Sequence, residues 1–179
     1  MISLYNSLTE RLSCADWLLS TLARLIFAAT LLFYFWVSGM TKLGEGFAGL
    51  FSPSVGAYAQ IFPKAMEAVT YDVTQLSGFH WAVVVAGTWA EFILPALIVI
   101  GLLTRLSALG MIGFVVVQSL TDLLGHGGLA HKETLGAWFD RFPDGVILDQ
   151  RAFWVFVLLV LVIKGAGPLS LDAALRRQT

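Results

Sequence analysis

The sequence predicts an all-α membrane protein, a four-transmembrane-helix bundle with a long, partly helical outer loop. The 179-residue chain is 58% hydrophobic and only 13% charged, and its mean hydropathy is +0.80. Soluble domains carry about 45–50% apolar and about 25% charged residues. Four long apolar runs recur along the chain, and the alternating pattern of membrane β-strands is absent. The length fits a single membrane domain, residues 1–179.

Each apolar run predicts one helix. The runs lie at approximately 17–39, 81–101, 105–124 and 152–171. A helix needs about 20 residues to cross a hydrocarbon core of about 30 Å, and the first three runs reach that length. The fourth is apolar only as far as Ile163. It spans the bilayer if Lys164 snorkels to the headgroups and the helix continues to Leu171.

Four crossings place both termini on one side of the membrane. That side carries six Lys and Arg residues, and the side of the two long loops, at about 40–80 and 125–151, carries five. The positive-inside rule therefore predicts cytoplasmic termini. In the first loop, apolar residues from Val55 to Val69 recur at helical spacing, interrupted at Pro63. This pattern fits either a short interfacial or re-entrant helix or a connector on the bilayer surface.

Charge and cysteine content exclude several classes of protein. A formal net charge of −1 excludes a strongly basic nucleic-acid binder. The single cysteine, Cys14, excludes an intrachain disulfide and a multi-cysteine metal site. His126 and His131 are loosely spaced in a Gly-rich loop, so we expect no metal there. All three histidines lie outside the apolar runs, so we expect no haem held by two histidines.

Glu91 is the most informative residue for function. It lies about 15 Å from either end of its predicted helix, so it should face the bundle interior. Pro95, four residues later, should kink the helix and expose a carbonyl beside the carboxylate. Two interpretations stay open. Glu91 is either a ligand or proton site, or it makes an interhelical hydrogen bond that only fixes packing.

Arg24 is the expected partner of Glu91. It lies about two turns inside the first helix, where it can either snorkel to the headgroups or reach inward. We predict that the two side chains meet, directly or through one water or ligand, and we regard both as catalytic candidates. Such a pair lowers the cost of each buried charge.

Two further features concern ligand binding and packing. Gly39 and Ser38 make the end of the first helix narrow, so a flat ligand can lie against it beside Lys42. Alternatively, Lys42 is a headgroup anchor. Small residues on the third helix, including Gly110 and Gly113, permit close contact either inside the bundle or with a second copy of the chain in a homo-oligomer.

Three stretches together resemble the DoxX family. The first, LARLIFAATLLFYFWVSGMTKL, contains Arg24 and the run Gly39–Lys42. The second, AEFILPALIVIGLLTRLSALGM, contains Glu91 and a Gly-Leu-x-x-Arg turn that ends at Arg105. The third, VIKGAGPLSLD, ends at Asp172 and is similar to the closing segment of the family. The resemblance covers all four predicted helices but little of the long loops.

The resemblance implies a multi-pass protein of the bacterial inner membrane. The family includes the small subunit of thiosulfate:quinone oxidoreductase, and other members accompany peptide-modifying iron enzymes in metal-handling systems. One reading is therefore an oxidoreductase subunit that binds a quinone. Glu91 would move protons, Gly39, Lys42 and Arg105 would contact the ligand, and a protein partner would bring the electrons. The other reading is a non-enzymatic anchor or scaffold for a metal-handling or peptide-modifying system.

Overall fold

The computed structural model describes residues 5–7, 9–10 and 15–177, so Arg11 and Cys14 lie outside the described residues. The described residues form helices and connecting turns and contain no strand, which confirms the all-α prediction. Four of the described helical stretches are long and apolar enough to cross a membrane, which confirms the predicted bundle. They are Trp17–Lys42, Gly78–Ile100, Thr104–Gly125 and Val146–Lys164.

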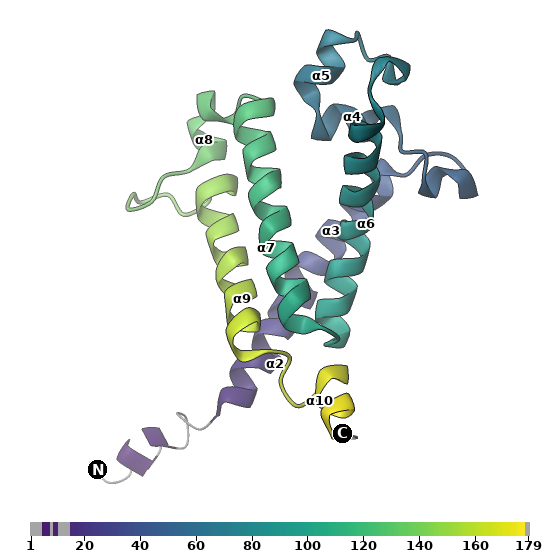
Figure 1. Ribbon diagram of the computed structural model, residues 1–179. Helices are drawn as coiled ribbons and strands as arrows, with labels where there is room; N and C mark the ends of the chain where they lie inside the picture. The colour runs from purple at the N-terminus through teal and green to yellow at the C-terminus, as the bar shows by residue number, and fades with distance from the viewer. Residues whose placement is uncertain (1–4, 8, 11–14, 178–179) are drawn as a thin grey trace.

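The membrane-spanning stretches are built mainly from α2 (Asp16–Phe27), α3 (Phe33–Lys42), α6 (Gly78–Ile100), α7 (Thr104–Leu120) and α9 (Arg151–Lys164). Figure 1 shows the start of α2 at the same end of the bundle as the C-terminal helix α10 (Leu171–Arg176), and we call this end the terminus side. The short helices of the two long loops lie at the opposite end, the loop side. α6 and α7 meet in a tight turn on the terminus side and diverge toward the loop side (Figure 1).

A π-helical turn, η1 (Ala28–Leu32), joins α2 to α3 without a break. The buried residues of this long helix recur every four positions, at Ala23, Phe27, Leu31 and Phe35. In a regular α-helix of about 3.6 residues per turn, this spacing drifts by roughly 40° at each step. One extra residue in the wider π turn offsets roughly 100° of this accumulated angular drift. The π turn therefore keeps these side chains on one face.

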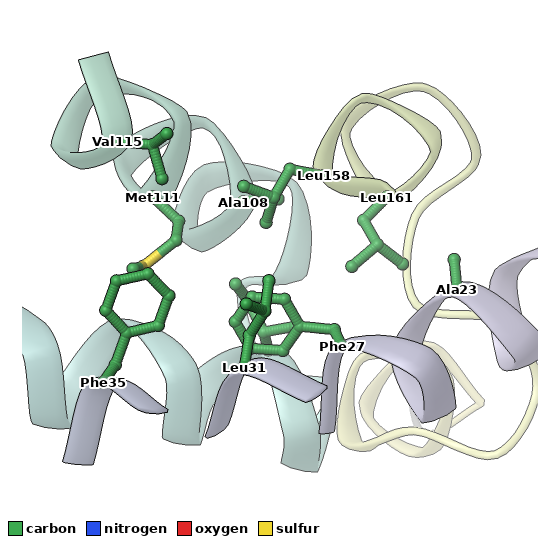
Figure 2. Close-up of a cluster of buried hydrophobic side chains, with 10 residues drawn as sticks. Ala23, Phe27, Leu31, Phe35, Ala108, Met111, Val115, Leu158 and Leu161 are labelled. Atoms are coloured by element: carbon green, nitrogen blue, oxygen red, sulfur yellow. The ribbon is translucent and has the colours of Figure 1, made fainter. Parts of the chain in front are cut away.

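The apolar core lies where this face meets α7 and α9 (Figure 2). Met111 of α7 points at the ring of Phe35, and Leu158 and Leu161 of α9 face the same helix farther along, nearer Phe27 and Ala23 (Figure 2). Lipid tails are as apolar as these side chains, so close packing rather than the hydrophobic effect holds the helices together. The core residues are Ala23, Phe27, Leu31, Phe35, Ile98, Ala108, Met111, Val115, Leu158 and Leu161.

The first long loop folds into short helices on the loop side. Two of them, α4 (Val55–Ile61) and α5 (Pro63–Ala68), are separated by one residue, and Pro63 takes the first helical position of α5. The interruption predicted at Pro63 is confirmed, because proline lacks the N–H that a continuing helix needs. Met66 packs with Val84 of α6 in a second apolar cluster. The loop is therefore a helical layer packed on α6. Two 3-10 turns, η2 (Phe47–Leu50) and η3 (Val73–Gln75), flank these helices.

The fourth membrane-spanning stretch lies closer to the N-terminus than predicted. It begins at Val146 and ends at Lys164, so the expected continuation to residue 171 is wrong. Gly165 ends the helix with a φ of +81°, a conformation that glycine adopts without steric penalty. At the start, the π turn η6 (Val146–Gln150) supplies the additional length. Lys164 is therefore the last residue of α9, at the end of the span.

The other three predicted helices are present, with boundaries that differ from the predicted ones by at most three residues. α6 continues through Pro95, which is fully buried. α7 packs inside the bundle, between α6 and α9. This packing supports the interpretation of the third helix as a bundle element, while its contact with a second copy stays a prediction.

An ion pair connects the loop-side ends of α7 and α9. Arg151 Nη2 lies 2.5 Å from Asp122 Oδ2, and Arg151 Nη1 donates to Ser119 Oγ at 3.0 Å. Asp122 belongs to a third π turn, η4 (Thr121–Gly125), which extends α7. Wide turns of this kind are frequent at functional sites. The second long loop above this pair contains η5 (Gly128–Ala130) and α8 (Lys132–Leu135).

Candidate ligand site

A buried ion pair joins the first and second membrane-spanning stretches. Lys42 Nζ lies 3.0 Å from Glu91 Oε1 and 2.9 Å from Glu91 Oε2. Lys42 is 4% exposed and Glu91 is 3% exposed, so bulk water solvates neither charge. A lone charge within a bilayer is unfavourable, and close pairing offsets much of that penalty. Glu91 therefore faces the bundle interior, as predicted, but its partner is Lys42.

Ser38 completes this cluster of polar groups. Its hydroxyl donates to Glu91 Oε1 at 3.0 Å and accepts from Lys42 Nζ at 2.7 Å. Ser38 and Lys42 are four residues apart on α3 and so share one face of the helix. A Cβ at Gly39 would lie 2.8 Å from the Phe92 ring. Gly39 therefore permits the close approach of α3 to α6, and it packs beside the site instead of lining it.

A cavity of about 390 Å³ lies between α6 and α7, next to the ion pair. Small-molecule sites span about 300–1,000 Å³, so this volume is sufficient for a compact ligand. The polar residues of its wall are Ser38, Lys42, Gln60, Glu91, Gln118, Thr121 and Asp122. The rest of the wall is apolar or glycine: Ile61, Val83, Ala86, Gly87, Ala90, Leu94, Gly110, Gly113, Phe114 and Val117. The cavity thus combines an apolar slot with one buried ion pair.

Small residues leave this cavity open at the surface of the bundle. Gly110 and Gly113 of α7 and Ala86 of α6 line it and are exposed. A Cβ placed at Gly113 would meet no atom within 4 Å. All three residues lie within membrane-spanning helices, so the opening faces the bilayer. A flat, lipid-soluble molecule can reach the ion pair through it.

Arg24 does not contact Glu91, so the predicted pair is wrong. Its Nε donates to the Ile98 carbonyl at 3.1 Å and its Nη2 to the Val99 carbonyl, while its Nη1 donates to the carbonyls of Ala166 and Leu169 at 2.9 and 2.6 Å. The last carbonyls of a helix lack partners within the helix and carry partial negative charge. Arg24 satisfies those at the end of α6 and joins them to the segment after α9.

Asp172 makes the complementary contact at the start of α7. Its carboxylate accepts from the N–H groups of Leu103 at 2.8 Å and Thr104 at 3.0 Å. Burial alone would raise the pKa of the Asp172 carboxyl, but these N–H donors and the charge of Arg176 outweigh it and hold the pKa below its usual range. The turn requires Gly101, which has a φ of +73° and lies against Ser170 and Arg24. The second and third resembling stretches therefore meet in one structural junction.

Two sets of sequence candidates lie away from the cavity. Arg105 is exposed on the terminus side near Gly165, so it is not brought to the ion pair. On the loop side, His126 Nε2 lies 2.9 Å from the Gln60 carbonyl, and His131 directly precedes α8. In the part of the chain that the structure describes, no three His, Cys, Asp or Glu side chains gather as metal ligands would. The absence of an essential metal stays a prediction.

Sequence reasoning missed Gln118 and the role of Asp122 in the cavity wall. Gln118 Nε2 donates to the Tyr34 hydroxyl at 3.0 Å, while its buried Oε1 has no hydrogen-bond partner. Gln118 and Asp122 are four positions apart, and they follow Gly110 and Phe114 at the same spacing of four. The recurrence of Gly, Gln and Asp at this helical spacing, interrupted only by Phe114, was the available signal, since it marks one face of α7 and the turn that follows it.

The four spans and the buried ion pair beside an open cavity define a multi-pass membrane protein with a candidate ligand site inside its helix bundle. Residues 19–121, more than half of the chain, match the DoxX family model. The chain therefore belongs to the DoxX family, and the resemblance found in the sequence is confirmed. Comparison with curated proteins and with solved structures found no match.

Proposed function

We propose that this protein is an inner-membrane subunit of a redox system that binds a quinone, or a similar lipid-soluble ligand, between α6 and α7. One observation carries the proposal: the buried Lys42–Glu91 pair forms part of the wall of an otherwise mostly apolar cavity that opens to the bilayer. Ionisable residues inside membrane spans are unfavourable, and they usually mark a ligand or proton site.

The residues of the cavity fit a quinone headgroup. The small residues Gly87, Ala90 and Gly113 leave room for a flat ring between the two helices. Lys42 can donate a hydrogen bond to a ring carbonyl, and the Glu91 carboxylate can hold or release a proton beside it. A bound quinone would supply the electron chemistry. Lys42, and not Arg24, is therefore the residue that we expect to control the charge of Glu91.

A redox role requires a partner protein that carries electrons to or from the site, and we propose that such a partner binds this subunit. The alternative function is a non-enzymatic membrane anchor or scaffold for a metal-handling or peptide-modifying system. Exposed aromatic side chains in the second long loop favour this alternative, since Trp138 is 63% exposed and Phe139 is fully exposed. Exposed aromatic residues are typical of interaction surfaces.

We also propose that the termini face the cytoplasm of a bacterium. Two of the five cations on the loop side, Lys42 and Arg151, are engaged in ion pairs within the bundle. The remaining Lys and Arg residues are more numerous on the terminus side, as the positive-inside rule requires of the cytoplasmic side.

Reporter fusions test this topology. A reporter fused after Thr179 should be active as a cytoplasmic fusion, and one inserted beside Lys132 should be active only outside the cytoplasm. The four membrane-spanning stretches are the reason for opposite sidedness. Activity of both fusions in one compartment would contradict the bundle topology, and a reversed pair would contradict the orientation alone.

The bound ligand is identified by mass spectrometry of lipids extracted from gently purified protein. We expect a quinone in the wild type and a several-fold loss in Gly113→Leu, because the added side chain fills open space in the cavity. Gly78→Leu is the matched control, since a Cβ at Gly78 also meets no atom but lies at the start of α6, away from the cavity. Equal quinone content in the two variants, or none in the wild type, would contradict the quinone proposal. Co-purification of a stable soluble partner without a quinone would support the alternative function as a scaffold.

A further inference from the structure

We propose that the cavity also serves as an aqueous path through which Glu91 exchanges a proton with the compartment on the loop side only. The inference rests on the proposed function in that it concerns the same site, but it does not require a bound quinone. Glu91 is the fourteenth residue of α6, so it lies about 20 Å from the loop-side end of that helix. A proton can cover that distance only along polar groups or water.

Polar side chains line the cavity between the loop side and the ion pair. Gln118, Thr121 and Asp122 follow one another along α7 and η4, and Gln60 lies opposite them at the end of α4. Gln118 Oε1 is buried without a hydrogen-bond partner. Unpartnered polar groups are strongly disfavoured in hydrocarbon. A wall of this composition therefore indicates that water reaches the cavity.

A second hollow lies next to the cavity, toward the loop-side surface. It has a volume of about 430 Å³ and lies between α5 and the end of α7. Three residues, Ile61, Val117 and Thr121, belong to the walls of both hollows. The second hollow extends to Lys64 and Gly125, at the level of the loop helices. The two hollows therefore adjoin each other, and in the proposed path water passes between them from the loop side to the ion pair.

The apolar core closes the route to the terminus side. Below the ion pair, the cavity ends at Leu94 and Gly110. The next side chains toward the terminus side include Phe27, Ile98 and Met111, each fully buried. Such a packed layer contains no space for a chain of water molecules. Arg24 and the Asp172 junction lie beyond it and are separated from Glu91.

The titratable side chains near Glu91 lie on the same side as the proposed path. Within the described residues, α7 contains none between Arg105 and Asp122. The titratable groups on the elements packed around the site are Tyr34 and Lys42 of α3, Tyr58 of α4, Lys64 and Glu67 of α5, His80 of α6 itself, Arg105 of α7, Asp122 and His126 after α7, and Arg151 and Lys164 of α9. Lys42 contacts Glu91, and Tyr34 contacts Gln118 of the cavity wall. Arg105 and Lys164 lie at the terminus-side ends of their helices, beyond the packed core. The other groups lie toward the loop side, so a proton relayed by any of them comes from that compartment.

Cysteine accessibility tests the path. Because the chain has one cysteine, a Cys14→Ser background permits single-cysteine variants in sealed proteoliposomes. A membrane-impermeant methanethiosulfonate should modify Thr121→Cys and Gly113→Cys from the same side as the loop marker Lys132→Cys. It should modify neither from the side of the terminus marker Arg177→Cys. Ala108→Cys, in the apolar core, is the matched control and should not react from either side.

These results separate the path from the quinone proposal, because labelling is measured in protein without added ligand. Reaction of Gly113→Cys from the terminus side would overturn the inference. A second result would also overturn the inference: neither Gly113→Cys nor Thr121→Cys reacts with the impermeant reagent, although a lipid-soluble maleimide modifies both. In that case the cavity contacts lipid only. A quinone could still be bound there.

A second measurement follows the proton itself. Dicyclohexylcarbodiimide modifies a carboxyl group in its protonated form, and mass spectrometry of the Glu91 peptide reports the modified fraction. In proteoliposomes with acidic buffer on one side and alkaline buffer on the other, modification should be several-fold greater when the loop side is acidic. Modification that follows the pH of the terminus side, or none under either gradient, would contradict the inference.

Discussion

Replacing Lys42 with methionine is expected to destabilise the protein by about 3–5 kcal/mol, because removing one partner of a buried ion pair leaves the other charge buried and unpaired. Glu91 would keep its burial and the Ser38 hydrogen bond but lose both contacts with the ammonium group. Thermal unfolding in detergent measures the effect. The control is Lys64→Met, because Lys64 lies on the loop side and has no partner of this kind in the membrane span. Equal stability of the two variants would contradict a structural role for the pair.

The charge-free double variant Lys42→Met/Glu91→Met separates structure from function. Removing both charges together leaves no uncompensated group, so we expect most of the lost stability to return. If the pair only holds α3 against α6, this variant should also keep its ligand and its activity in the partner complex. If the pair is a proton and ligand site, the variant should fold but lose quinone content and activity. Full activity with restored stability would contradict the functional assignment of Glu91.

The second large effect is expected for Arg24→Met. The guanidinium donates to four carbonyls in two segments, at the end of α6 and after α9. A single hydrogen bond from a charged group contributes about 1.5–3 kcal/mol, and carbonyls left unpaired add a penalty. We expect a loss of roughly 3–5 kcal/mol in the free energy of unfolding. We also expect faster proteolysis of the segment that contains α10.

Arg105→Met is the matched control for Arg24→Met. Arg105 is exposed on the same side of the bundle, and surface substitutions usually change stability by less than about 0.5 kcal/mol. Similar unfolding temperatures for the two variants would contradict the junction at Arg24. A marked loss of quinone in Arg105→Met, with unchanged stability, would restore Arg105 as a ligand residue.

Hydrophobicity and helix length were sufficient to predict the four spans and their order. A bilayer admits few spanning structures, so composition alone restricts the fold strongly. The interior orientation of Glu91 could also be predicted, because a carboxylate at that depth is strongly disfavoured against lipid. The end of the fourth helix could not be predicted in this way. Gly165 stops it by adopting a positive φ, and hydropathy contains no information about that choice.

The sequence by itself determined an all-helical membrane bundle, one buried acid and the short Gly-Leu-x-x-Arg turn that joins the second and third spans. Only the tertiary structure decided which cation meets which partner. Axial position alone favoured Arg24 over Lys42 as the partner of Glu91, but axial distances do not specify rotation. The π turn at residues 28–32 rotates the two halves of the first long helix relative to a regular α-helix. With that rotation, Lys42 faces Glu91 from the loop side while Arg24 meets the carbonyls that end α6. Side-chain pairing depends on these rotations and on helix crossings, which arise from contacts between segments far apart in the chain.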